Sequence, residues 1–194
     1  MKKIYQVRVK LLSALHINGG TNADGVRITV KQDGQAYIPA TLFKGIVREN
    51  YSKMVSLVDE AHATHRADTV SAPCSCSTCK MFGRAGFQQS RIIFDNLECR
   101  QPLNYMTRTN VGVDRYLQTS MAGALVFTQV VEPFDADGMP VEFSGQITAY
   151  FTENQKAEEA CLWKALELIN CIGLGKSRGL GFVEVSVNEA ESGI

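Results

Sequence analysis

The alternation of apolar and polar residues predicts the strands of this chain, and two longer segments have the pattern of helices. Seven short segments read as strands: 3–12, 26–30, 35–38, 92–94, 122–131, 142–151 and 182–187. Asp33-Gly34 lies between the second and third of these segments and is typical of a tight hairpin turn. Helices are predicted from about 41 to 60, after Pro39, and from 152 to about 172.

The order of the main elements is strand, helix, strand, strand, helix, strand, with two long insertions. This order is the ferredoxin-like split βαβ pattern. We therefore predict an α+β fold with a ferredoxin-like, RRM-like core, in a single domain over residues 1–194. In the first helix, Leu42, Ile46 and Val55 belong to an apolar stripe, while Lys44 and Arg48 lie one turn apart on another side.

Composition narrows the class of protein. The hydrophobic fraction of 45% is ordinary for a globular chain. The formal net charge of zero argues against nonspecific, charge-driven binding to nucleic acid, although it permits a local basic face. The chain has no run of 18 apolar residues and begins as a strand, not as a secretory signal. We expect a cytoplasmic protein with no membrane partner.

A glycine-rich loop, Gly173 to Gly181, has the composition of a phosphate-binding loop. Its four glycines permit close backbone approach, and Lys176, Ser177 and Arg178 supply two cations and a hydroxyl. The loop follows a helix and precedes a strand, which is the reverse of a Walker loop, so a polymeric phosphate ligand is expected over a mononucleotide. The alternative is a helix C-cap and turn with no ligand.

A cysteine cluster is the second chemical signal. Cys74, Cys76 and Cys79 form a C-x-C-x-x-C run, and His62 and His65 stand upstream. Three thiolates with one imidazole make a closed, structural zinc site, and we favour His65 because it is the nearer histidine. The alternative is three reduced cysteines on a loop.

The chain resembles the RAMP superfamily of CRISPR systems, and most closely the repeated backbone subunit of type III effector complexes. The segment Tyr37 to Arg48 is similar to the strand-to-helix motif of that family, although Ala40-Thr41 replaces the usual Gly-Ser pair. Three further segments resemble its zinc knuckle with the following strand, its thumb hairpin and its glycine-rich loop: 76–83 with 90–92, 107–115 with 123–125, and 173–181. The insertions then span about 60–90 and 101–121.

The resemblance implies a subunit that polymerises along a CRISPR guide RNA with copies of itself and other effector-complex subunits. Phosphate contacts of this kind position an RNA strand without reading its sequence. The expected RNA-binding residues are Lys44, Arg48, Arg91, Arg108, Arg115, Lys176, Ser177 and Arg178. Each isolated arginine has the alternative of being a solvated surface charge.

Type III relatives cleave the target RNA with an aspartate and a divalent metal, and Asp24 matches that aspartate by position. The resemblance therefore implies that Asp24 is catalytic, with magnesium or manganese as cofactor. An ordinary Asx turn is the alternative for Asp24, and Asp33 is better explained by its hairpin. Two other functions stay open: a non-cleaving guide-RNA scaffold, and a guide-processing endoribonuclease with His16 as the acid–base residue.

Overall fold

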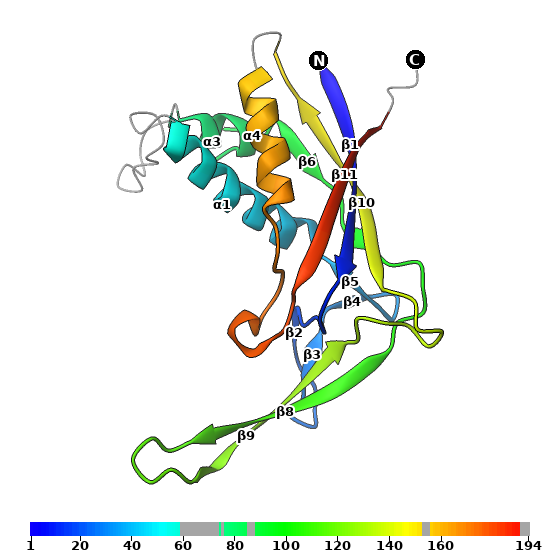
Figure 1. Ribbon diagram of the computed structural model, residues 1–194, viewed down its shortest axis with the longest axis vertical. Helices are drawn as coiled ribbons and strands as arrows, with labels where there is room; N and C mark the ends of the chain where they lie inside the picture. Colours follow the sequence, from blue (N-terminus) through cyan, green and yellow to red (C-terminus); the bar gives the residue numbers. More distant parts are fainter. Residues whose placement is uncertain (59–73, 75, 85–87, 153–155, 191–194) are drawn as a thin grey trace.

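The computed structural model of the protein describes residues 1–58, 74, 76–84, 88–152 and 156–190 (Figure 1). It is an α+β structure that consists mostly of strands. The strands are β1 Lys2–Leu11, β2 Asn18–Thr21, β3 Arg27–Thr29, β4 Lys31–Gln32, β5 Gln35–Ile38, β6 Ile92–Phe94, β7 Leu97–Glu98, β8 Tyr105–Val113, β9 Ser120–Val131, β10 Glu142–Tyr150 and β11 Val183–Ala190. The helices of these described residues are α1 Ala40–Val58, α3 Ser77–Phe82, α4 Lys156–Glu167 and the 3-10 turn η1 Lys176–Arg178.

In the larger sheet the first strand lies between the last two long strands of the chain. Its order is β11-β1-β10-β7-β5-β4, and β6 pairs with β10 beside β7. Val7 in β1 faces Gly145 in β10 on one side and Val187 in β11 on the other, and both pairings are antiparallel. Helices α1 and α4 lie on the same side of this sheet (Figure 1). The alternation predicted for residues 3–12 is therefore confirmed.

The core lies between this sheet and its helices. Tyr5, Val7, Val9 and Leu11 alternate into it from β1 and are fully buried. These side chains belong to one cluster with residues of α1, α3 and α4. Burial of such a face supplies most of the favourable free energy of folding. None of the described helices is both long and apolar enough to cross a membrane.

Helix α1 confirms the predicted helix, but its buried face is one residue away from the predicted centre. Phe43, Val47 and Tyr51 are fully buried, whereas Leu42 and Ile46 pack half-buried at the edge of the core. The helix contacts the sheet on one side and α3 and α4 on others, so its apolar surface is wider than a single stripe.

The second helix was predicted to continue to about Ile172, and this boundary is wrong. Helix α4 ends at Glu167. The residues that follow bond to the chain returning toward β11, because the amide of Ile172 donates to Gly181 O at 2.8 Å and the amide of Val183 donates to Asn170 O at 3.0 Å. Between Asn170 and Ile172, hydrogen bonds to the returning chain therefore take the place of helical hydrogen bonds.

A smaller sheet of order β2-β3-β9-β8 carries a long hairpin away from the core (Figure 1). Strands β8 and β9 pair antiparallel from Tyr105↔Val131 to Val113↔Ser120. The hairpin predicted within 101–121 and the strand predicted at 122–131 are thus one continuous structure. Strand β3 joins it in parallel, with Arg27 opposite Thr128.

Candidate functional site

The glycine loop between α4 and β11 is held by its own backbone. Gly173, Gly175, Gly179 and Gly181 all have positive φ, between 76° and 83°. A Cβ on Gly173 would lie 2.3 Å from His16 O, and one on Gly181 would lie 2.0 Å from Ile172 O. Only glycine fits at these two positions, because the backbone approaches another carbonyl too closely for any side chain.

Hydrogen bonds attach the glycine loop to the segment after β1. The amides of Leu174 and Gly181 donate to His16 O and Ala14 O at 2.9 and 2.8 Å. Within the loop, the amides of Arg178 and Leu180 donate to Gly175 O at 2.8 and 3.2 Å. The loop therefore has a defined shape without a ligand, and many of its amides are already used by the chain itself.

The polar residues predicted at the tip of this loop are exposed together. Lys176, Ser177 and Arg178 form the 3-10 turn η1, and all three are exposed. Lys176 also acts on α1, because its charge contributes to lowering the pKa of Glu49, after the larger effect of the hydrogen bond from Lys53. The loop tip and α1 are therefore electrostatic neighbours.

Helix α1 carries the next two predicted RNA-binding residues, and the structure gives them different surroundings. Lys44 is half-buried, and burial followed by the nearby charge of Arg48 lowers its pKa. The Arg48 guanidinium donates from Nη2 to Cys79 Sγ at 3.8 Å. Lys44 therefore lies near another positive charge, whereas the Arg48 guanidinium is directed at the cysteine cluster.

The cysteine cluster contains Cys74, Cys76 and Cys79, whose sulfur atoms all lie within 4.8 Å of one another. Cys76 is the N-cap of α3, and its sulfur accepts the Cys79 amide at 3.4 Å. Cys76 and Cys79 are buried and Cys74 is half-buried. Burial, followed by the neighbouring thiols, raises the pKa of Cys79 to about 12.

This donor set fits a metal ion. Sulfur atoms gathered in this way are the ligands that a soft divalent ion such as zinc binds as thiolates. The cluster could therefore hold a metal such as zinc. The proposed fourth ligand, His65, and its alternative His62 lie outside the described residues.

The turn that carries Asp24 joins β2 to β3. Asn22 Oδ1 accepts the amides of Asp24 and Val26 at 3.1 and 2.9 Å, so Asn22 and not Asp24 organises the turn. The Asp24 carboxylate is exposed and accepts one hydrogen bond, at 3.3 Å from Asn22 Nδ2. The alternative in which the Asp24 carboxylate accepts the turn amides is therefore not the arrangement found.

The smaller sheet adds a cation that sequence reasoning missed. Arg27 in β3 and Arg108 in β8 both face Thr128 in β9. In-register residues project from the same face of a sheet, so the two arginine side chains leave the same face on either side of this threonine. Alternation over 26–30 places Arg27 on the opposite face from Val26 and Ile28, but only the parallel pairing of β3 with β9 brings Arg27 into register with Arg108.

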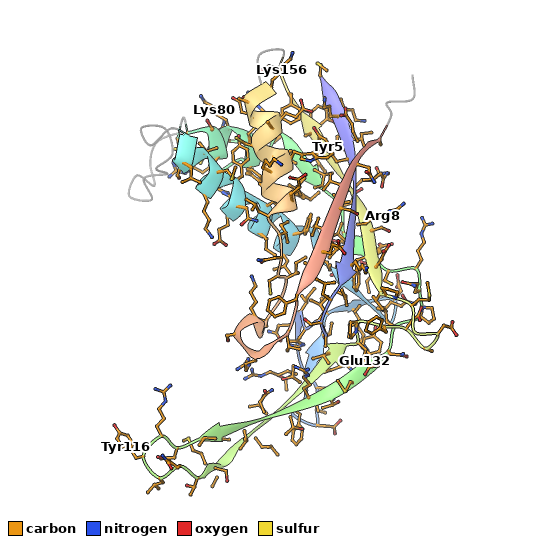
Figure 2. The ribbon with its side chains drawn as sticks, viewed as in Figure 1. Tyr5, Arg8, Lys80, Tyr116, Glu132 and Lys156 are labelled. Atoms are coloured by element: carbon orange, nitrogen blue, oxygen red, sulfur yellow. The ribbon has the colours of Figure 1, made fainter. Side chains whose placement is uncertain are left out.

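The remaining predicted cations lie at opposite ends of the molecule. Arg115 is exposed in the β8–β9 turn beside Tyr116, which is 97% exposed at the far end of the hairpin (Figure 2). Arg91 lies between α3 and β10, because its amide donates to Met81 O and its carbonyl accepts the amide of Tyr150. Arg91 is thus a neighbour of α3 and not of the hairpin.

His16 is a core histidine bonded to the backbone. It is 3% exposed, and its Nδ1 lies 2.8 Å from Gln129 O. Burial, and to a lesser extent the charge of Arg27, lowers its pKa. A buried neutral imidazole is poorly placed for acid–base chemistry on a polymer.

Residues 8–184 match the sequence model of the RAMP superfamily. The match begins within β1 and ends within β11. It therefore includes the Asp24 turn, the cysteine cluster, the β8–β9 hairpin and the glycine loop. No curated protein matches the chain.

Proposed function

The chain belongs to the RAMP superfamily, and from that premise we propose that it is the guide-RNA-binding backbone subunit of a type III CRISPR effector complex. Membership of the superfamily implies a CRISPR-associated, RNA-binding subunit. The type III role, the assembly with copies of itself and other effector-complex subunits, and the cleavage of target RNA are the proposal.

The order of strands around β1 supports the ferredoxin-like, RRM-like core that belongs to this proposal. When the short strands β2–β5 between β1 and α1 are set aside, α1 lies between β1 and β6 in the chain, and α4 lies between β10 and β11. The order of these four strands across the sheet is β11-β1-β10-β6, with antiparallel neighbours. In a split βαβ unit, each helix connects two strands that are separated by a third strand. Both α1 and α4 make such a connection here.

The RNA-binding proposal rests on one observation: the elements that carry the predicted RNA-binding cations lie on the same side of the molecule. The first part of α1, the glycine loop and the β8–β9 hairpin follow one another down one side of the molecule (Figure 1). We propose that Lys44, Lys176, Ser177 and Arg178 contact guide phosphates on this side, where cations and hydroxyls position the strand. Arg108 and Arg115 would contact RNA along the hairpin, and Arg27 joins them as a new candidate.

Asp24 is the proposed catalytic residue. Its turn is part of the sheet that carries the hairpin, and Arg27, three residues later, faces Arg108 across β9. An exposed carboxylate could bind Mg²⁺ or Mn²⁺ together with RNA phosphates. Within the described residues, the cysteines are the one group of three or more metal donors, so a catalytic ion at Asp24 would take its other ligands from RNA and water.

The experiment that tests this proposal is cleavage of a labelled target RNA by the assembled complex. Asp24→Ala is expected to abolish cutting while guide and target binding stay intact, because the exposed side chain supports no buried contact. Asp33→Ala, in the neighbouring β4–β5 turn, is the matched control and should cut at the wild-type rate. Wild-type cutting by Asp24→Ala would instead leave the non-cleaving scaffold as the better account.

The guide-processing alternative is disfavoured by a specific observation. It requires His16 to reach the RNA backbone, whereas His16 is 3% exposed beneath the glycine loop. Incubation of the purified chain with isolated repeat RNA is expected to give no cleavage product. Site-specific cleavage that disappears in His16→Ala would revive this alternative.

A further inference from the structure

Arg48 has a structural environment that differs from that of the other predicted RNA contacts. It follows Lys44 by one turn of α1, and its guanidinium donates to Cys79 Sγ at 3.8 Å. Cys79 is completely buried, while Arg48 is half-buried. The guanidinium therefore connects α1 to the sulfur cluster at the start of α3.

Carboxylates do not compete for this guanidinium among the described residues. Glu49, the adjacent acid on α1, pairs with Lys53 at 2.7 Å instead. Arg48 lines a groove between α1 and α3 together with Ser52, Lys53 and Thr78. A phosphate could enter such a groove. Arg48 could therefore act either as a donor to the cysteine cluster, which is the first role, or as a contact for RNA phosphate, which is the second. Its contact with the Cys79 sulfur favours the first role.

The charge of a metal-loaded cluster favours the first role. Three thiolates and one divalent ion leave one net negative charge, and a buried charge is costly unless it is paired. An arginine stays protonated in any protein environment and donates in a fixed plane. Since Cys76 Sγ already accepts the Cys79 amide at 3.4 Å, Arg48 adds a second donor to the same cluster.

We propose that Arg48 is a positioning residue of the metal centre, which balances the thiolate charge and fixes α3 against α1, and is not a contact for guide RNA. This inference rests on the proposed metal site. Donors around metal-bound sulfur orient the ligands, and their loss weakens metal affinity about 10–100-fold in known centres. Arg48 would then separate from Lys44 in function, although the two are sequence neighbours on one helix.

Cobalt titration of the purified apo chain tests the inference, because cobalt thiolate sites have a strong sulfur-to-metal absorption band. Arg48→Met is expected to weaken Co²⁺ binding by about 10–100-fold and to shift that band. Arg48→Lys should recover part of the affinity. The matched control, Lys44→Met, removes an equal charge one turn away and should bind Co²⁺ as the wild type does.

RNA binding by the same variants supplies the second measurement. We expect Arg48→Met to keep the wild-type salt dependence of RNA binding, and Lys44→Met to make it shallower. Unchanged Co²⁺ affinity in Arg48→Met would overturn the inference, and a shallower salt dependence in that variant would return Arg48 to the RNA contacts. Absence of Co²⁺ binding by the wild type would be a different failure, that of the metal site itself.

Discussion

The glycine loop and the cysteine cluster are both short polar segments next to a helix, yet they are stabilised in different ways. The glycine loop uses backbone hydrogen bonds to the chain itself, including those to Ala14 O and His16 O. The cysteine cluster gathers three sulfur atoms within 4.8 Å, at the N-terminus of a helix of only six residues. The glycine loop is thus held in place by its own hydrogen bonds. The cysteine cluster instead gathers the sulfur donors of a site that could bind a cation.

This difference suits the glycine loop to binding a partner and the cysteine cluster to a structural role. Because the glycine loop needs no ligand to hold its shape, its exposed Lys176 and Arg178 are available to a partner. Because the cysteine cluster gathers its sulfur atoms where two of the three residues are buried, an ion bound there would contribute to folding.

Removal of one cysteine ligand should have the largest effect. Cys79→Ser is expected to lower metal affinity by more than about 100-fold, because a thiolate ligand is lost together with its packing. Protection of α3 amides from hydrogen exchange should fall with it. Metal content and hydrogen exchange of the purified chain measure both effects.

Cys99→Ser is the control, since Cys99 is also buried but lies outside the cluster. It should keep one metal per chain and normal protection of α3. A Cys79→Ser protein with full metal content would contradict the assignment of the cluster.

The glycine loop should tolerate alanine at one glycine and not at another. Gly179 and Gly181 have nearly equal φ, 78° and 76°, but a Cβ meets nothing within 4 Å at Gly179 and lies 2.0 Å from Ile172 O at Gly181. Gly179→Ala is expected to lower the free energy of unfolding by about 1 kcal/mol, from backbone strain alone. Gly181→Ala should lower it by about 3 kcal/mol or more, because the clash with a carbonyl is added.

Denaturant unfolding of the two variants gives the difference directly. Equal destabilisation would mean that the close approach of Gly181 to Ile172 is not maintained in solution. The account of the loop as a self-supporting structure would then fail.

The sequence predicted those elements whose burial follows a simple period. Strand β1 alternates because one face meets the helices, and α1 follows Pro39 as expected. The stretch from Tyr105 to Ser120 has no sustained period, because the outer part of the hairpin projects from the core and leaves even apolar residues exposed: Val111 and Val113 are 53% and 56% exposed. Resemblance to a family, and not periodicity, predicted this hairpin.

Predictions were weakest where residues distant in sequence meet. The end of α4 depends on Gly181 and Val183, which pair with Ile172 and Asn170 after the loop has turned back. The contact of Arg48 with Cys79 joins residues 31 positions apart and is invisible to local pattern. Cys74, Cys76 and Cys79 were predictable as a cluster because their spacing alone brings the sulfurs together.

The most direct test of the account is the salt dependence of RNA binding when the exposed loop cations are removed. A Lys176→Ala, Arg178→Ala double variant should bind single-stranded guide RNA more weakly, and its log–log salt slope should fall by about 1.4, or about 0.7 for each lost phosphate contact. The control is Lys2→Ala with Arg8→Ala, which removes the same charge from exposed positions that share one face of β1.

The control variant should keep the wild-type slope, because its cations lie on the larger sheet and away from the side formed by α1, the glycine loop and the hairpin (Figures 1 and 2). If the glycine loop contacts the RNA backbone, the slope becomes shallower in the loop variant alone. Equal slopes in the wild type and the loop variant, or equal losses in both variants, would contradict the claim that the glycine loop holds the guide RNA.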